Sequence, residues 1–179
     1  VFEPPALNEV STGFAQGQEI GLNTNQNYIV SNSTVNLVDN NVNIKMQNNQ
    51  VLTTGYGDNL LVGLWQTGDK NQNTHFTSRG NLNIDINDKS NKAQYHAAAG
   101  IILAGDNGAK MTLNNTNIKI KSITDNDYIG GAIVLGYPDY DNSSTRVGTV
   151  LESKGKMILD TTEAPNVATL NLHGQGSLF

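Results

Sequence analysis

The sequence predicts an all-β fold: a right-handed parallel β-helix (β-solenoid) of about four coils, each with three short strands. Three observations predict it. The composition favours strands and turns, apolar segments recur at nearly constant spacing, and turn-forming residues separate these segments. The chain has 179 residues, the size of one domain that can bury a core without disulfide bonds.

The composition argues against a helical protein. The chain contains 26 Asn, 18 Gly and 16 Thr, whereas charged residues make up only 15% and aromatic residues only 6%. Asn, Gly and Thr are poor helix formers, so a helix bundle or a helix-covered parallel sheet is disfavoured. A net charge of −5 and scattered basic residues argue against a nucleic-acid-binding protein. The absence of cysteine excludes disulfide bonds and thiol chemistry within the chain.

The clearest internal repeat is an apolar segment between glycines. Residues 63–69 (Gly-Leu-Trp-Gln-Thr-Gly-Asp) match residues 100–106 (Gly-Ile-Ile-Leu-Ala-Gly-Asp), and a looser third copy begins at Gly131. A second series alternates apolar and polar residues, as a strand with one buried face does. Its members start at Val42, Leu82, Ile118 and Met157, which lie 40, 36 and 39 residues apart. The two series interleave in constant order, which indicates successive coils.

A third strand is expected in every repeat. Shorter apolar segments cover residues 34–38, 74–78, 109–113 and 147–152, and turn-forming Asn, Asp and Gly lie between the segments. We therefore expect a solenoid over residues 27–179 and an N-terminal cap segment over residues 1–26. Because the sequence begins at Val1 and ends inside a strand-like segment, we expect a fragment of a longer protein.

Stacking the alternating strands on their first apolar residues predicts a surface ladder of charges. If those four residues share one inward column, the outward position three residues later holds Lys45, Asp85, Lys121 and Asp160. Neighbouring strands of a sheet lie about 4.8 Å apart, so charges of alternating sign attract one another across the strands.

The longest insertion in the third repeat is the first candidate ligand-binding site. It contains Tyr137, Asp139, Tyr140, Asp141 and Arg146. Tyrosine and arginine recur at binding hot spots, and loops on a rigid scaffold often carry function. The alternative is an insertion that the solenoid merely tolerates.

The second candidate surface is a flat outward face that bears Asn43, Asn83 and Lys119 with neighbouring Asn and Thr. Repeated amide groups on this face can hydrogen-bond glycans or a second copy of the same face. The alternative is an outer surface that only contacts water.

No arrangement of residues predicts catalysis or a metal site. His75, His96 and His173 occupy dissimilar places in the repeat and lack a paired ligand spacing. The serine near the C-terminus is not in a Gly-x-Ser-x-Gly turn. The acidic turns at 125–127 and 139–142 lack the closing Glu and the Gly of a calcium-binding EF-hand loop. We therefore expect no catalytic residues, no metal and no cofactor.

A glycoside hydrolase needs two suitably spaced carboxyl groups, and Asp85 and Asp160 are the pair to consider. In the predicted ladder a lysine lies between them, and its charge disfavours the protonated form that an acid catalyst needs. A solvated row of salt bridges is therefore favoured over a catalytic pair.

The repeat texture resembles a known group of proteins. Residues 81–86 (Asn-Leu-Asn-Ile-Asp-Ile) and 100–105 (Gly-Ile-Ile-Leu-Ala-Gly) are similar to the stacked coils in passenger regions of monomeric, type V bacterial autotransporter adhesins. The resemblance covers about residues 27–179. It implies a right-handed β-helix outside the cell, displayed from the outer membrane at the bacterial surface. It also implies adhesion to host or neighbouring cells, or self-association in biofilms.

We expect a cell-surface adhesin fragment that binds a host-cell or bacterial surface protein or glycan through loops and polar faces, without catalysis. No apolar run approaches the 18 residues of a membrane span, so we expect no membrane insertion by this fragment, and no nucleic-acid partner. One alternative is a polysaccharide-degrading β-helix enzyme. The other is a structural stalk or a self-associating biofilm module.

Overall fold

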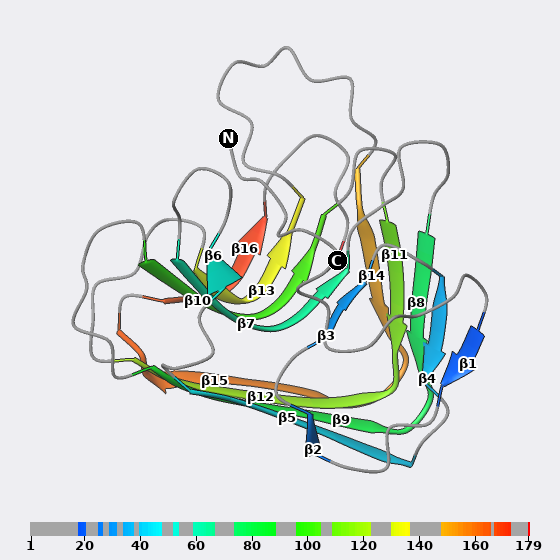
Figure 1. Ribbon diagram of the computed structural model, residues 1–179, viewed down its shortest axis with the longest axis horizontal. Coiled ribbons are helices and arrows are strands. Elements are labelled where there is room, and N and C mark those ends of the chain that lie inside the picture. Colours follow the sequence, from blue (N-terminus) through cyan, green and yellow to red (C-terminus); the bar gives the residue numbers. More distant parts are fainter. Residues whose placement is uncertain are drawn as a thin grey trace.

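The computed structural model describes residues 18–20, 25–26, 29–31, 34–37, 40–47, 52–53, 59–66, 74–88, 96–104, 109–122, 130–136, 148–165, 167–172 and 179. Three parallel sheets surround one core, and each takes a strand from every coil (Figure 1). We name them sheet A (β1, β4, β8, β11, β14), sheet B (β2, β5, β9, β12, β15) and sheet C (β3, β7, β10, β13, β16).

The four coils each contribute one strand to sheets A, B and C in turn. The first contains β4 (Val35–Leu37), β5 (Asn41–Gln47) and β7 (Asn59–Gln66), and the second contains β8 (Thr74–Ser78), β9 (Asn81–Asp88) and β10 (His96–Leu103). The third contains β11 (Ala109–Leu113), β12 (Asn115–Ser122) and β13 (Gly131–Leu135), and the fourth contains β14 (Val150–Ser153), β15 (Met157–Glu163) and β16 (Ala168–Leu172). The predicted parallel β-helix of about four three-stranded coils is confirmed.

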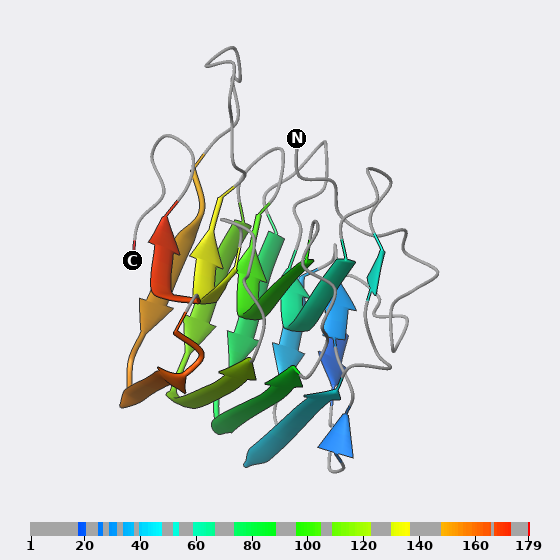
Figure 2. The same ribbon diagram turned by 90° about the vertical axis from the view of Figure 1, so that its left-hand side faces the viewer.

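The winding is right-handed, as the sequence predicts. In Figure 1 the chain passes clockwise from sheet A through sheet B to sheet C, and Figure 2 shows the coils following one another from the N-terminal to the C-terminal end. Short strands precede the first full coil: β1 (Gln18–Ile20), β2 (Asn25–Gln26) and β3 (Ile29–Ser31) pair with β4, β5 and β7. In addition, β6 (Leu52–Thr53) pairs antiparallel with β7. Strands β1 and β2 lie in the segment expected to form a cap.

The core consists of inward residues stacked coil upon coil. Ile84 lies between Ile44 and Ile118, and Ile86 lies between Met46 and Ile120, in the register of sheet B. All six side chains are buried. Each coil of a solenoid contacts only the coils next to it. The main stabilisation therefore comes from the apolar side chains that neighbouring coils bury against each other.

The register between the second and third coils differs from the expected one by two residues. Leu82 lies opposite Thr116, not opposite Ile118, and Thr116 lies opposite Met157. The expectation was wrong because the first inward residue of β12 is polar, so the apolar pattern starts one inward position late. Thr116 is nevertheless only 2% exposed. A shift of two residues keeps every side chain on its predicted face.

The glycine repeat is confirmed for two of its three copies. Gly63 and Gly100 occupy equivalent positions, because the pairs Val62–Ala99 and Leu64–Ile101 flank them. A Cβ atom on Gly100 would lie 2.5 Å from the carbonyl oxygen of Ala132 and 2.6 Å from Cγ2 of Ile118. The backbone therefore approaches the core too closely for a side chain at this position.

The third copy of this repeat is shifted by one residue from the predicted alignment, which matched Gly131 with Gly100. Gly131 lies opposite Ala99, while Ile133 and Leu135 lie opposite Ile101 and Leu103. Stacking these branched side chains on one another determines the register, and the glycine is displaced by one position.

Three strands of sheet C, β7, β10 and β13, are buried on both faces where their side chains are described, whereas β16 at its end is exposed. Trp65, Ile102 and Val134 lie in one row across the sheet and are at most 1% exposed, yet they are outside the central core cluster. Both faces of a strand are apolar in such a sheet, which explains the near-continuous apolar runs of β7, β10 and β13. Exposed polar side chains are instead concentrated on sheets A and B.

Candidate functional site

The insertion loop predicted to bind ligand lies outside the described residues. This applies to all five of its candidate residues, Tyr137, Asp139, Tyr140, Asp141 and Arg146, and to the acidic turn at 125–127. The loop therefore remains a prediction from the sequence. The second predicted surface, the outward face of sheet B, lies within the described residues.

A row of alternating charges crosses sheet B, with one change from the predicted ladder. Lys45 lies opposite Asp85, Asp85 lies opposite Lys119, and Lys119 lies opposite Asp160. Lys119 therefore takes the place predicted for Lys121, which lies opposite Asn87 and Glu163 instead. The correction follows from the two-residue register shift at Thr116, and the sign still alternates because both positions carry lysine.

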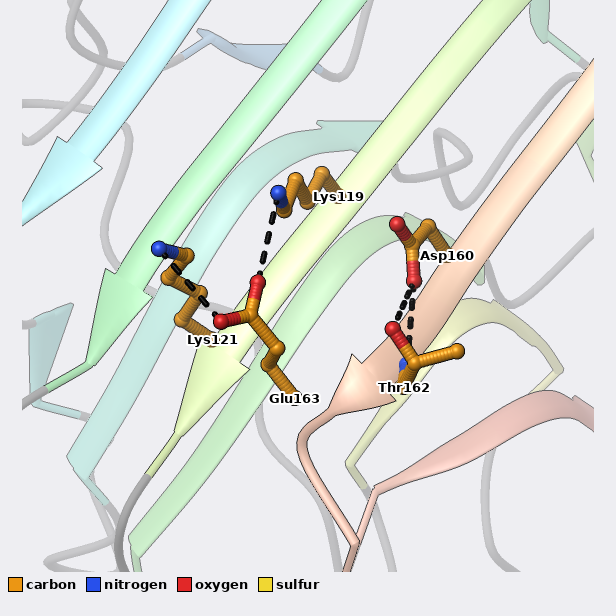
Figure 3. A network of polar contacts seen from close by, with 5 residues as sticks. All are labelled: Lys119, Lys121, Asp160, Thr162 and Glu163. Atoms are coloured by element: carbon orange, nitrogen blue, oxygen red, sulfur yellow. Dashed lines mark hydrogen bonds and ion pairs between the residues drawn. The ribbon is translucent and has the colours of Figure 1, made fainter.

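A bulge in β15 redirects the pairing of these charges. Lys119 and Lys121 are two residues apart, but their partners Asp160 and Glu163 are three apart, so β15 carries one extra residue. This brings Glu163 between the two lysines (Figure 3). Its Oε2 lies 3.2 Å from Nζ of Lys119, and its Oε1 lies 3.5 Å from Nζ of Lys121.

The carboxylate of Asp160 is held within its own strand. Thr162 donates two hydrogen bonds to Oδ1 of Asp160, from its backbone nitrogen at 3.0 Å and from its hydroxyl at 2.7 Å. These bonds stabilise the ionised carboxylate and lower the pKa of Asp160. The turn that they form accommodates the extra residue of the bulge (Figure 3).

The electrostatics of this network favour permanent charge. The hydrogen bond to Glu163 raises the pKa of Lys119, and the same contact lowers the pKa of Glu163. A general acid must hold a proton near neutral pH, which requires a raised carboxyl pKa. Asp160 and Glu163 are shifted the other way, so their arrangement suits ion pairing and hydrogen bonding to a polar ligand.

Two rows of amides run across sheet B beside the charged row. In the first, Nδ2 of Asn81 donates to Oδ1 of Asn41 at 2.9 Å, and Nδ2 of Asn115 donates to Oδ1 of Asn81 at 3.2 Å. The row ends where the backbone nitrogen of Lys156 donates to Oδ1 of Asn115 at 2.9 Å. This continuous chain of bonds joins all four coils at the start of the sheet B strands, and we call it the asparagine ladder.

The second amide row contains two of the residues predicted for the flat face. Nδ2 of Asn83 donates to Oδ1 of Asn43 at 3.2 Å, and Asn117 follows in register as the next member of the row. Lys119, the third predicted residue, lies in the adjacent charged row. The prediction that Asn43, Asn83 and Lys119 share one face is therefore confirmed. We call the surface formed by Asn43, Asn83, Asn117, Asp85 and Lys119 the polar face.

Of the three histidines, His75 is the one whose side chain the structure describes. The ring Nε2 of His75 lies 2.9 Å from Oγ1 of Thr112 on sheet A, and the backbone nitrogen of His75 donates to Oγ1 of Thr34. His96 begins β10 but its side chain is outside the described part, as is all of His173. Among the described residues, no group of three or more His, Asp or Glu side chains is placed to hold a metal ion.

Sequence reasoning missed three elements of this surface. Glu163 and Thr162 were missed because a bulge breaks the two-residue period from which outward positions are counted. The asparagine ladder was missed although its signal is present, since Asn41, Asn81 and Asn115 each open a sheet B strand.

Comparisons with known proteins add no assignment. No family model, no curated protein and no solved structure matches the chain. The described residues contain no helix long and apolar enough to span a membrane.

Proposed function

We propose that this chain is an adhesin-type binding module that recognises surface glycans through the polar face of sheet B, without catalysis. The observation that supports it is the regular array of that face. Amide groups and charges of both signs recur from strand to strand at the spacing of a parallel sheet, about 4.8 Å. Amide side chains both donate and accept hydrogen bonds, which suits the hydroxyl groups of a carbohydrate.

The rigidity of the array supports the same proposal. Each outward side chain is carried by a strand that is bonded to its neighbours on both sides, and the asparagine ladder holds the start of these strands. A preorganised surface loses little conformational entropy on binding. Because the groups repeat, a repetitive or clustered ligand can make several weak contacts at once, which raises the overall affinity.

The setting that fits this function is the outside of a bacterial cell, as the resemblance to autotransporter passengers implies. In that setting the coils hold the polar face away from the membrane and present it to a host or neighbouring cell. The insertion loop with Tyr137, Tyr140 and Arg146 is a second contact region of the same binding module.

A glycan array and a whole-cell binding assay with the 179-residue chain test the proposal. We expect the double variant Asn83→Ala/Asn117→Ala to bind about tenfold more weakly, because it removes two hydrogen-bonding groups worth about 1 kcal/mol each at most. Thr77→Ala, on the outer face of sheet A, is the matched control and should bind as the wild type does. A chain that binds no glycan and no cell surface would favour a structural stalk instead.

The loop is tested separately by the triple variant Tyr137→Ala/Tyr140→Ala/Arg146→Ala. If this variant loses binding while the polar-face variant keeps it, the loop is the ligand site and the polar face is only a hydrated surface. If turnover of a polysaccharide is detected, the binding-module proposal is replaced by the enzyme alternative.

A further inference from the structure

Two lysines of β12 stand side by side on the outward face of sheet B. Lys119 and Lys121 are two residues apart on this strand, so their Cα atoms are separated by about 6.6 Å and both side chains point outward. We call them the lysine pair. Strand β12 lies between β9 and β15, so the lysine pair is inside the sheet and not at its edge. Because a further strand adds beside a sheet and not over it, the pair stays on the surface in a longer chain.

The lysine pair already holds one carboxylate, which comes from Glu163 of the next coil. Each lysine amine contacts one oxygen of that carboxylate, at 3.2 Å for Lys119 and 3.5 Å for Lys121 (Figure 3). The three side chains are between 43% and 50% exposed, so a ligand can reach them. The spacing of the two amines therefore fits a single carboxylate group. Glu163 takes the position that the carboxylate of an acidic ligand would otherwise take.

The charges around the lysine pair disfavour a second carboxylate. Asp85 lies opposite Lys119 on one side and Asp160 lies opposite it on the other. Together with Glu163, three carboxylates surround two amines, which gives this part of the face a net charge of −1. The hydrogen bond to Lys119 lowers the pKa of Glu163, so this carboxylate is ionised at neutral pH. An acidic ligand is repelled at this point, whereas a neutral ligand is not.

We propose that Glu163 is a specificity-determining residue: it excludes acidic glycans from the polar face, and the face therefore selects neutral glycans. This inference rests on the proposed function, because it names the class of glycan that the polar face binds. A binding surface discriminates between ligands partly through groups that repel the wrong one. Here the repelling group is the carboxylate of Glu163, and the wrong ligand is a sugar with a carboxylate of its own, such as a uronic acid. The amides of Asn83 and Asn117 suit the uncharged hydroxyl groups of a neutral sugar.

Two forms of one polysaccharide separate the effect of charge from that of shape. Polygalacturonate carries a carboxylate on every sugar, and its methyl ester has the same backbone without the charge. Glu163→Gln should raise the affinity for the acid form, relative to the ester, about tenfold, because it frees both lysine amines and removes a repelling charge. Biolayer interferometry at low ionic strength measures both affinities. Glu152→Gln removes the same charge from an exposed residue of sheet A and is the matched control that should leave the ratio unchanged.

Further variants assign the gain to the lysine pair. The triple variant Glu163→Gln/Lys119→Gln/Lys121→Gln should lose the gain, because no amine remains to hold the carboxylate of the ligand. Glu163→Asp keeps the negative charge and should exclude the acid form as the wild type does. The gain of Glu163→Gln should disappear at about 1 M salt, where charges are screened beyond about 3 Å. A change in the fold alone would not produce this salt dependence.

The outcomes distinguish this inference from the proposed function. A wild type that binds acidic glycans as tightly as neutral ones would overturn the role of Glu163 and leave the binding module intact. A Glu163→Gln variant without the gain, or an equal gain in Glu152→Gln, would do the same. A wild type that binds no glycan on the array would instead overturn the proposed function, and the selection of neutral glycans with it.

Discussion

Thr116 lies opposite Leu82 at an inward position of sheet B, and its buried hydroxyl has no hydrogen-bond partner in the described structure. Met157 lies on its other side, so both neighbours in this column are apolar. A buried polar group without a partner costs about 1–3 kcal/mol. We predict that Thr116→Val raises the free energy of unfolding by about 1 kcal/mol or more, measured by urea denaturation.

Thr112 supplies the matched comparison for that variant. It is also a buried threonine, but its hydroxyl lies 2.9 Å from Nε2 of His75. We expect Thr112→Val to lower the free energy of unfolding by about 1 kcal/mol, because it removes this hydrogen bond. The two substitutions are chemically identical and should have opposite signs. Destabilisation by both would show that Thr116 has a partner in solution.

The asparagine ladder is expected to stabilise the stack. Asn81 both donates to Asn41 and accepts from Asn115, so Asn81→Ala removes two bonds between coils. We predict a loss of about 1 kcal/mol. Asn117→Ala, an exposed position in the next amide row, should change stability by less than about 0.5 kcal/mol. Equal effects of the two variants would mean that the ladder bonds contribute nothing beyond those to water.

Gly100 and Gly131 differ in the space that they leave for a side chain. A Cβ atom on Gly100 would meet a backbone oxygen at 2.5 Å, whereas the closest contacts on Gly131 would be 3.2 Å. We predict that Gly100→Ala destabilises the protein by about 3 kcal/mol and Gly131→Ala by about 1 kcal/mol or less. The fluorescence of Trp65, the single tryptophan, reports unfolding of sheet C in both variants.

Acidification should destabilise the fold through His75. Burial lowers the pKa of His75 below its usual value of 6.5, and the positive charge of Lys110 lowers the pKa further. The native state therefore binds this proton less readily than the unfolded chain does. The stabilisation is present above pH 6.5 and is lost as the pH falls below it.

The variant His75→Asn isolates this effect. Urea midpoints measured between about pH 7.5 and 5.5, around the usual histidine pKa, should fall with pH in the wild type and change less in the variant. A wild type that gains stability on acidification, or an identical slope in both proteins, would contradict the assignment to His75.

The fold could be predicted because the alternating strands show their period openly. Val42 and Leu82 begin two strands whose apolar residues follow every second position, and the structure stacks them as expected. The prediction failed where a residue's chemistry and its burial disagree. Thr116 is polar and inward, so counting apolar residues alone displaced the third strand by two positions and assigned the charge row to Lys121 in place of Lys119.

The candidate site was predictable only in part, and for a related reason. Outward positions follow from the alternating pattern, so Asn43, Asn83 and Lys119 were assigned to one face correctly. The ion pairs of Glu163 depend on one extra residue in β15 and on a turn held by Thr162. Neither the extra residue nor the turn can be recognised from the alternation of apolar and polar residues, because a bulge shifts that alternation by one residue at the point where it occurs.

The direction of the hydrogen bonds between coils determines how this protein responds to tension. The strands lie across the axis along which the coils stack (Figure 2). A pull along that axis loads the hydrogen bonds between coils and should separate the coils one after another. Equivalent ladder residues are 34 to 41 positions apart, so each released coil adds roughly 110–150 Å of extended chain. A single molecule held between two optical traps would therefore lengthen in a few discrete steps. Each step reduces the tension on the molecule before the bond to its attachment point breaks.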